Sequence, residues 1–247
     1  MKVFLLGYNA VTYLDQWFKV SNYKNAEFYF IDNGNQELPQ TIKDIHLYTT
    51  TKNIGCGGGW NLICDIAFNH MGLEKVIIGE EDAIFNQEMI ESLWEYCDSD
   101  RVMTTYGNGF GYALFCIHKD TFNKIGRFDE NIMYAAYEDA DHKVRCSKGN
   151  VEVFCMEVDS SLNGNSTAWD LNSPRNAIHE HNKQYFIKKW GMDFDINSLY
   201  HDIPFNNMPT FTFDPTLEEH YGQLIKFPSE TEYEKYKSIS ETLLILK

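Results

Sequence analysis

The chain has 247 residues, of which 43% are hydrophobic and 15% aromatic, and this composition supports a packed core and excludes a disordered protein. The formal net charge of −15 argues against tight binding to a nucleic-acid backbone, although a local basic groove stays open as an alternative. No stretch is apolar for long enough to span a bilayer, so we expect no transmembrane segment.

Strand and helix patterns alternate through the first half of the chain. We expect strands at residues 3–6, 27–31, 45–48 and 75–78, and helices at residues 11–20 and 60–71. Residues 50–59 are polar and rich in glycine, which is typical of a loop. The alternation predicts an α/β fold, in which a mixed, mostly parallel sheet is flanked by helices. In such a sheet, ligands bind where the strands end.

The second half of the chain is less regular. Strands are expected at residues 101–105, 112–117 and 151–156, and helices at residues 119–125, 142–147 and 176–190. Residues 194–247 hold four of the six prolines, and we interpret them as a C-terminal extension that packs on the core or serves the assembly of an oligomer. The predicted domain therefore spans residues 1–193, with halves at 1–100 and 101–193.

The six cysteines form no CxxC pair and show no zinc-binding spacing, and most of them have apolar neighbours. We therefore expect reduced, buried thiols and a cytoplasmic location. No basic and apolar regions of a signal peptide precede the first strand pattern.

One acidic cluster lies just before a predicted helix. Glu138, Asp139 and Asp141 put three carboxylates into four positions. Such carboxylates are costly to bury unless a cation, a proton or a polar ligand uses them. The helix dipole favours negative charge at this end, and the cluster suggests a general base.

A second acidic group, Glu80-Glu81-Asp82, follows an apolar strand pattern. Side chains alternate along a strand, so Glu80 and Asp82 are expected on the same side. Two neighbouring carboxylates are natural ligands of Mg²⁺ or Mn²⁺, and the alternative is a solvated acidic turn.

The segment from Asn53 to Gly59 has the composition of a phosphate-binding loop, but it lacks the Lys-Ser/Thr of a P-loop and does not fit the dinucleotide-binding fingerprint. Its glycines are expected to let a nucleotide or another strand approach closely. Asp32, in a turn after a buried strand, is by itself typical of an Asx turn.

Several motifs occur in a fixed order along residues 2–190. They are Gly7-Tyr8-Asn9, Phe30-Ile31-Asp32-Asn33-Gly34, Asn53-Ile54-Gly55 through Gly59-Trp60-Asn61, Glu80-Glu81-Asp82, Gly111 to Phe115 with His118-Lys119, Phe122 with Ile125-Gly126, Phe128-Asp129-Glu130, and Tyr137-Glu138-Asp139 with Asp141, Arg145 and Gly149. In this order they resemble the inverting glycosyltransferases of family two, which have the GT-A fold, and especially their rhamnosyltransferase-like branch.

The resemblance implies a Rossmann-like nucleotide-binding half followed by an acceptor half. It implies an enzyme that moves a sugar, with inversion, from a nucleoside-diphosphate sugar to a hydroxyl of a glycan, a lipid-linked sugar or another acceptor. If the source is viral, modified DNA bases are a further acceptor class, against which the acidic charge argues.

The resemblance also implies site residues. Asp139 would be the catalytic base, supported by Glu138 and Asp141. Glu80 and Asp82 would bind Mn²⁺ or Mg²⁺ at the diphosphate. The residues implied for the nucleotide sugar are Tyr8, Asp32, Asn53, Gly58, Asn61 and Glu81.

The chain departs from the family pattern in its metal ligands. Ser161 stands where family members often have a histidine ligand, and the Asp-x-Asp motif is Glu-x-Asp, so His118 or a water would have to complete the site. A catalytically inactive binding or structural relative is therefore one alternative. A nucleotidyltransferase is another, although the loop at Gly7-Tyr8-Asn9 lacks the basic residue expected of that class. The tail after residue 188 resembles those of phage and large-virus relatives.

Overall fold

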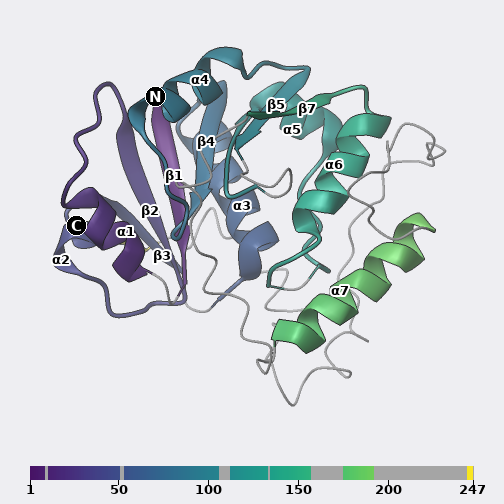
Figure 1. The fold of residues 1–247 in the computed structure, drawn as a ribbon, viewed down its shortest axis with the longest axis horizontal. Helices are drawn as coiled ribbons and strands as arrows, with labels where there is room; N and C mark the ends of the chain where they lie inside the picture. Colours follow the sequence, from purple (N-terminus) through teal and green to yellow (C-terminus); the bar gives the residue numbers. More distant parts are fainter. Residues whose placement is uncertain are drawn as a thin grey trace.

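The computed structural model describes residues 1–8, 11–50, 53–105, 112–132, 134–156, 175–191 and 244–246, and for residues 175–178 and 244–246 it describes the backbone alone. A sheet of eight strands runs through these residues in the order β7-β5-β6-β4-β1-β2-β3-β8 (Figure 1). The strands are β1 Lys2–Gly7, β2 Glu27–Asn33, β3 His46–Thr50, β4 Lys75–Glu80, β5 Arg101–Thr105, β6 Leu114–His118, β7 Glu152–Met156 and β8 Leu244–Leu246.

Helices cover both faces of the sheet. They are α1 Val11–Phe18, α2 Gln40–Lys43, α3 Gly55–Asp65, α4 Gln87–Tyr96, α5 Lys119–Ile125, α6 Glu138–Lys148 and α7 Arg175–Trp190, and a π-helical turn, η1 Ile66–His70, extends α3. The strands β1–β2, β2–β3, β1–β4 and β5–β7 pair in parallel, whereas β6 is antiparallel to both β4 and β5. The predicted class, a mixed, mostly parallel sheet flanked by helices, is confirmed.

The central strand β1 divides the interior into two hydrophobic cores. Phe4 and Leu6 point into the core shared with α3, and Val3 and Leu5 point into the core shared with α1 and α4. This alternation follows from the two-residue period of a strand, and it explains why β1 is apolar at successive positions. Burial of each such side chain contributes about 1.5–3 kcal/mol.

The glycine-rich segment differs from its prediction. Residues 50–59 were expected to be a loop followed by a helix at residue 60, but α3 already begins at Gly55. A Cβ atom at Gly59 would lie 2.5 Å from the side chain of Leu6, so the missing side chain lets α3 pack directly on β1. Of the two expected neighbours, another strand is the one found at Gly59, and the approach of a nucleotide to this segment stays a prediction.

One further boundary and two helices differ from the prediction. The helix predicted at residues 142–147 begins at Glu138, so the acidic cluster forms its first turn instead of preceding it. The helix α4 was not predicted, although Asn86 caps it by accepting a hydrogen bond from the main-chain N–H of Met89 at 2.9 Å. The short helix α2 was not predicted either.

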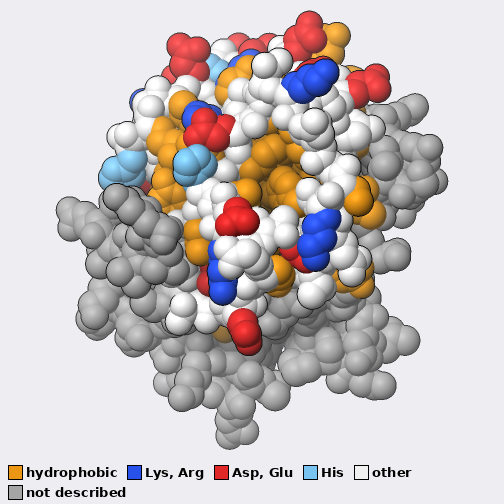
Figure 2. Space-filling model, turned by 90° about the vertical axis from the view of Figure 1, so that its left-hand side faces the viewer, with side chains coloured by type: hydrophobic (Ala, Val, Ile, Leu, Met, Phe, Trp, Pro, Cys, Tyr) orange, Lys and Arg blue, Asp and Glu red, His pale blue; other side chains and the backbone are white. Residues whose placement is uncertain are grey.

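The surface is mixed in character. On the face shown in Figure 2, apolar side chains gather near the centre, and acidic and basic side chains lie scattered around them. No helix within the described part of the chain is both long and apolar enough to cross a membrane.

Candidate active site

Three neighbouring parallel strands end at one edge of the sheet and bring predicted residues together. In the register of the sheet, Gly7 lies opposite Asp32 of β2, and Leu6 lies opposite Glu80 of β4. Tyr8 follows Gly7 directly. The predicted residues at the ends of β1, β2 and β4 therefore share one edge, as expected of parallel strands.

Tyr8 lies at this edge with its aromatic ring partly accessible to solvent, and 40% of the residue is exposed. Its ring packs on Gly34, where φ is +139° and where a Cβ atom would lie 2.9 Å from the ring, so glycine is required there. The pKa of Tyr134 is raised to about 12, mainly by burial and then by the charge of its neighbour Tyr8. Such a ring can stack against a planar base or a sugar.

The polar residues beside this ring shape the start of α3. The side-chain amide of Asn33 donates to Oδ1 of Asn53 at 3.1 Å, and the same oxygen accepts from the main-chain N–H of Gly55 at 2.8 Å. Oδ1 of Asn33 accepts from the main-chain N–H of Ile54 at 2.9 Å. These bonds fix the chain between β3 and α3, next to Tyr8.

Asp32 is 2% exposed, and its carboxylate stabilises the turn after β2. It accepts hydrogen bonds from the main-chain N–H of Gln36, at 3.1 and 3.2 Å, and from the hydroxyl of Thr49 at 3.0 Å. The geometry is that of a turn-capping aspartate, and its part in binding a base stays a prediction.

Asn61 and Gly58, both predicted for the nucleotide sugar, lie inside α3. The amide of Asn61 donates to the main-chain oxygen of Phe128 at 2.9 Å and to Oε1 of Glu130 at 2.7 Å, and its oxygen accepts from the N–H of Phe128. Asn61 therefore ties α3 to the segment before α6. Gly58 is buried, and a Cβ atom there would lie 3.3 Å from Ile54.

Glu80 is held by two residues of α3. Its Oε1 accepts a hydrogen bond from the indole N–H of Trp60 at 2.7 Å, and its Oε2 lies 3.9 Å from Sγ of Cys56. The carboxylate of Glu81 lies against Gly7 of β1, where a Cβ atom would collide with it. The two neighbouring glutamates therefore lie against different parts of the fold.

Burial and neighbouring acidic residues act together on Glu80 and Cys56. Burial raises the pKa of Glu80 well above its usual value, and the charges that raise it further come from Asp82, Glu81 and Glu138. Burial likewise raises the pKa of the Cys56 thiol, and the same four carboxylates add to that effect. Glu138 comes from α6, far along the chain from β4, and the main-chain N–H of Cys56 donates to the oxygen of Tyr134, in the segment just before α6.

Glu138 and Asp139 form the first turn of α6 and differ in exposure. Glu138 is 7% exposed, and its Oε2 is buried without a hydrogen-bond partner among the described residues. Burial and then the charge of Asp139 raise the pKa of Glu138 well above its usual value. Asp139 is half-buried, and its Oδ1 accepts from the main-chain N–H of Ala140 at 2.8 Å.

Asp141, predicted to support the base, belongs to a buried ionic network. Its carboxylate accepts from Nε of Arg145 at 2.9 Å, from Nζ of Lys189 at 2.5 Å and from the indole N–H of Trp190 at 2.9 Å. Burial alone would raise the pKa of Asp141, but Arg145 and Lys189 outweigh it and hold the pKa below the usual value. The bonds of Asp141 to Lys189 and Trp190 therefore connect α6 to α7.

The backbone just before α6 is strained. Tyr134, Ala136 and Tyr137 have φ values of 52°, 79° and 77°, in the left-handed region. The other non-glycine residues with positive φ in the described chain are asparagines, which tolerate this region. Each such residue costs about 1–3 kcal/mol and persists only where its surroundings enforce it.

A metal-binding group is incomplete in the described residues, which contain no cluster of three His, Cys, Asp or Glu side chains suited to a metal ion. His118, one of the residues expected to complete the site, lies opposite Lys75 at the far end of β4 from Glu80. That expectation is wrong, because the length of the strand separates the two side chains. Ser161 lies outside the described residues.

Several residues of the site were not predicted to have a role in it. Trp60, Cys56 and the strained residues Tyr134 and Ala136 depend on contacts between distant segments. Asn182 of α7 is a further case, and no pattern in the sequence marks it. Only the glycines before Trp60 gave a signal, because their density predicts a close approach.

No protein-family model matches the chain, and no curated protein matches it. Solved structures share its general shape. A protein from Desulfovibrio desulfuricans, described as a nucleotide-diphospho-sugar transferase, is 15% identical with a TM-score of 0.43, over 78% of this chain and 99% of that one.

Two galactosyltransferases show a similar level of likeness. The galactosyltransferase LgtC, solved with donor and acceptor sugar analogs, is 13% identical with a TM-score of 0.39, over 62% of this chain and 73% of that one. A Drosophila β-1,4-galactosyltransferase 7 mutant, solved with manganese, UDP-Gal and xylobiose, is 11% identical with a TM-score of 0.43, over 71% and 72%. At these values the activity has to be inferred from the residues of the site.

Proposed function

We propose that the protein is a glycosyltransferase that moves a sugar from a nucleoside-diphosphate sugar to an acceptor hydroxyl, with inversion and with the help of a divalent cation. One observation supports this most: Trp60 and Cys56 of α3 bond to Glu80 of β4, and the main-chain N–H of Cys56 also donates to the oxygen of Tyr134 at 2.6 Å. One end of α3 therefore joins the acidic group after β4 to the segment that leads into the acidic first turn of α6. Tyr8 follows β1 at the edge of the sheet where β4 ends.

The two acidic clusters divide the work of an inverting transfer. Asp139, at the half-buried start of α6, takes the proton of the acceptor hydroxyl as that oxygen attacks the anomeric carbon. The bond from the anomeric carbon to the diphosphate breaks, and the nucleoside diphosphate leaves on the opposite side. The positive charge that develops on the sugar, as in glycoside hydrolysis, is stabilised by surrounding carboxylates.

The residues at the end of β4 fit a divalent cation in their chemistry. Carboxylate oxygens are the preferred ligands of Mg²⁺ and Mn²⁺, and Glu80 and Asp82 supply them. Burial and the neighbouring carboxylates raise the pKa of Glu80, so a bound cation would displace its proton and restore a carboxylate ligand. When bound, the cation neutralises charge on the leaving diphosphate. Tyr8 and Asn53 would contact the nucleoside, and the donor oxygens of the diphosphate would complete the coordination.

Binding and hydrolysis of the donor test this proposal. A panel of nucleoside diphosphates, each with and without Mn²⁺, should contain one that raises the melting temperature only when Mn²⁺ is present, because a ligand of the folded state stabilises it by about 2.7 kcal/mol at 100 times its Kd. The corresponding nucleoside-diphosphate sugar should then be hydrolysed slowly without an acceptor, and the anomeric configuration of the released sugar, followed by NMR, should be inverted.

Asp82→Asn should abolish the Mn²⁺-dependent shift, whereas Asp98→Asn, at an exposed position far from β4's end, should leave it unchanged. Absence of a shift with every nucleotide, together with absence of hydrolysis, would contradict the proposal and would favour the inactive binding protein. A nucleotide that binds without any effect of Mn²⁺ would contradict the metal assistance alone.

A further inference from the structure

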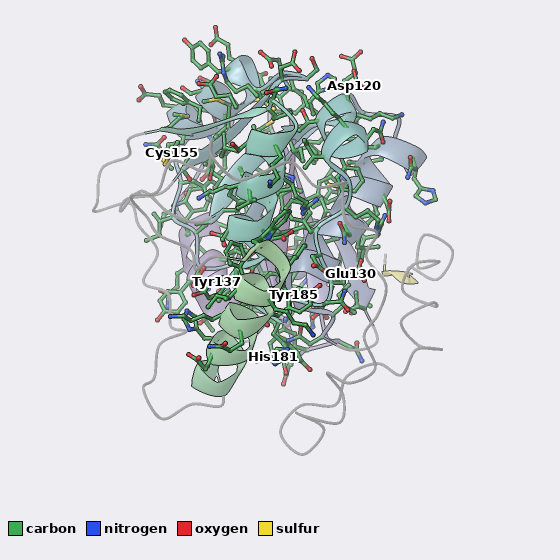
Figure 3. The ribbon with its side chains drawn as sticks, turned by 90° about the vertical axis from the view of Figure 1, so that its right-hand side faces the viewer. Asp120, Glu130, Tyr137, Cys155, His181 and Tyr185 are labelled. Atoms are coloured by element: carbon green, nitrogen blue, oxygen red, sulfur yellow. The ribbon has the colours of Figure 1, made fainter. Side chains whose placement is uncertain are left out.

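The strained segment before α6 is enclosed between two helices. On one side, α3 meets it: the main-chain N–H of Cys56 donates to the oxygen of Tyr134, and a Cβ atom at Gly55 would lie 2.9 Å from Cα of Tyr134. On the other side lies α7, whose residue Tyr185 and the neighbouring Tyr137 are labelled in Figure 3. The ring of Tyr137 lies 5.3 Å from the ring of His179 and 5.4 Å from that of Phe186.

One side chain of α7 bonds directly to the strained backbone. The amide of Asn182 donates to the main-chain oxygens of Ala135 and Ala136, each at 3.0 Å, and the residue is fully buried. Both oxygens belong to the backbone around Ala136, whose φ is 79°. Rotation of φ at Ala136 would turn the peptide group that carries the oxygen of Ala135 relative to Ala136, so the two bonds depend on this dihedral angle.

The segment determines where α6 begins. Tyr137, also with positive φ, is the residue before α6, and its oxygen accepts from the main-chain N–H of Asp141 at 2.9 Å, which closes the first turn. Glu138 and Asp139 lie within that turn. A change in the dihedral angles at Ala136 or Tyr137 would therefore redirect both carboxylates.

The C-terminal part of α7 has anchors of its own. Lys189 pairs with Asp129 at 2.7 Å and with Asp141, and the hydroxyl of Tyr185 donates to Asp129 at 2.9 Å. These bonds anchor the C-terminal part of the helix. The hydrogen bonds of the Asn182 amide therefore stabilise the strained segment, while other bonds anchor the helix that carries it.

We infer that Asn182 is a positioning residue, whose amide holds the segment from Tyr134 to Tyr137 in its left-handed conformation and so directs Glu138 and Asp139 into the site. The part of this inference that concerns catalysis rests on the proposed function. The part that concerns the backbone does not.

Hydrogen–deuterium exchange tests the structural part without any substrate. Asn182→Leu removes the donor and keeps the branched shape of the side chain, and Asn182→Ala serves if the variant with the larger leucine does not fold. The amides of residues 134–141 should exchange about tenfold faster, as expected when a local opening becomes easier. Residues 184–190 should exchange as in the wild type. The matched control is Gln184→Leu, which removes an exposed amide from the same helix.

Kinetics test the catalytic part. Asn182→Leu should lower kcat for donor hydrolysis about 10- to 100-fold, as a small misplacement of catalytic groups does, and leave the donor KM and the Mn²⁺-dependent melting shift unchanged. Unchanged exchange at residues 134–141 would overturn the inference, as would faster exchange with unchanged kcat. Failure of both variants to fold while Gln184→Leu folds would also overturn it. Lack of donor binding by the wild type would instead contradict the proposed function, and the exchange result would still decide the structural part.

Discussion

Asp139 and Asp141 are two positions apart in one helix, yet their surroundings give them different tasks. Arg145 and Lys189 hold the pKa of Asp141 below its usual value against the effect of burial, so this carboxylate does not accept a proton near neutral pH. Asp139 is half-buried and borders Glu138, whose pKa burial raises. The base of the proposed reaction is therefore Asp139, and Asp141 serves the fold.

The role of Asp139 leads to the first prediction. Asp139→Asn should lower kcat of transfer by about 10²- to 10⁴-fold, because the amide cannot take the proton of the acceptor. The affinity for the nucleoside diphosphate, measured by calorimetry with Mn²⁺, should stay within a factor of two or so of the wild type. Glu88→Gln, at an exposed position on α4, is the control. Unchanged turnover of the Asn variant would remove Asp139 as the base.

A second prediction concerns Asp141. Asp141→Asn leaves Arg145 and Lys189 buried with less compensating charge and should lower the free energy of unfolding by about 3–5 kcal/mol. Asp100→Asn, whose side chain is 73% exposed in its pair with Lys124, should change it by less than about 1 kcal/mol. Urea unfolding at neutral pH measures both.

The loss of unfolding free energy in Asp141→Asn should depend on pH in a defined direction. Because the folded-state pKa is lowered, the stabilisation by this carboxylate is complete above the usual value of 3.8 and disappears as the pH falls through the lowered pKa. The difference in unfolding free energy between wild type and Asp141→Asn should therefore shrink below pH 3.8. A difference that stays constant from neutral pH to acid would show that the loss is one of packing.

At the scale of elements, α3 shows how packing overrides propensity. Glycine is a poor helix former, and four glycines among residues 55–59 predict a loop, yet the helix forms because Gly59 lets it approach β1. The strands were predicted well because β1, β2 and β4 are buried on both faces and therefore read as apolar runs. The helix α2 was not predicted because it is too short to show a helical period of hydrophobic residues.

The third prediction follows from α3. Gly59→Ala places a Cβ atom 2.5 Å from Leu6 and should lower the free energy of unfolding by about 1–3 kcal/mol. In Gly57→Ala the nearest atom, the oxygen of Asp129, is 3.4 Å away, so the helix propensity of alanine should leave stability unchanged or raise it by up to about 1 kcal/mol. Thermal or urea unfolding of the pair compares them. Equal losses in both variants would mean that α3 does not pack through Gly59.

The candidate site was predictable only in part, for a physical reason. Residues at strand ends follow from topology, so Tyr8, Asp32 and Glu80 could be placed at one edge from the sequence alone. The strained segment could not, because positive φ at tyrosine and alanine is imposed by distant contacts and has no local signature. The role of Asn182 could not be predicted from the sequence for the same reason, since an asparagine in a helix indicates no particular hydrogen-bond partner.

At the scale of the whole molecule, the net charge of −15 opposes compaction. About 0.15 M NaCl should raise the melting temperature, because the screening length falls to about 8 Å. Mn²⁺ at matched ionic strength should raise it further through binding near β4. The variant Glu80→Gln with Asp82→Asn should keep the effect of NaCl and lose the extra effect of Mn²⁺. An equal response of variant and wild type would place Mn²⁺ binding elsewhere.

The pairing of β8 with β3 has a consequence for how the chain folds. Leu246 lies opposite Leu47 in an antiparallel ladder, although the two residues are 199 positions apart in the sequence (246 − 47). A contact of such long range forms slowly, because a large loop must close first. We expect the other strands to assemble earlier and to leave the hydrogen-bonding groups of β3 uncovered for a time, when a second copy of the chain could pair with them.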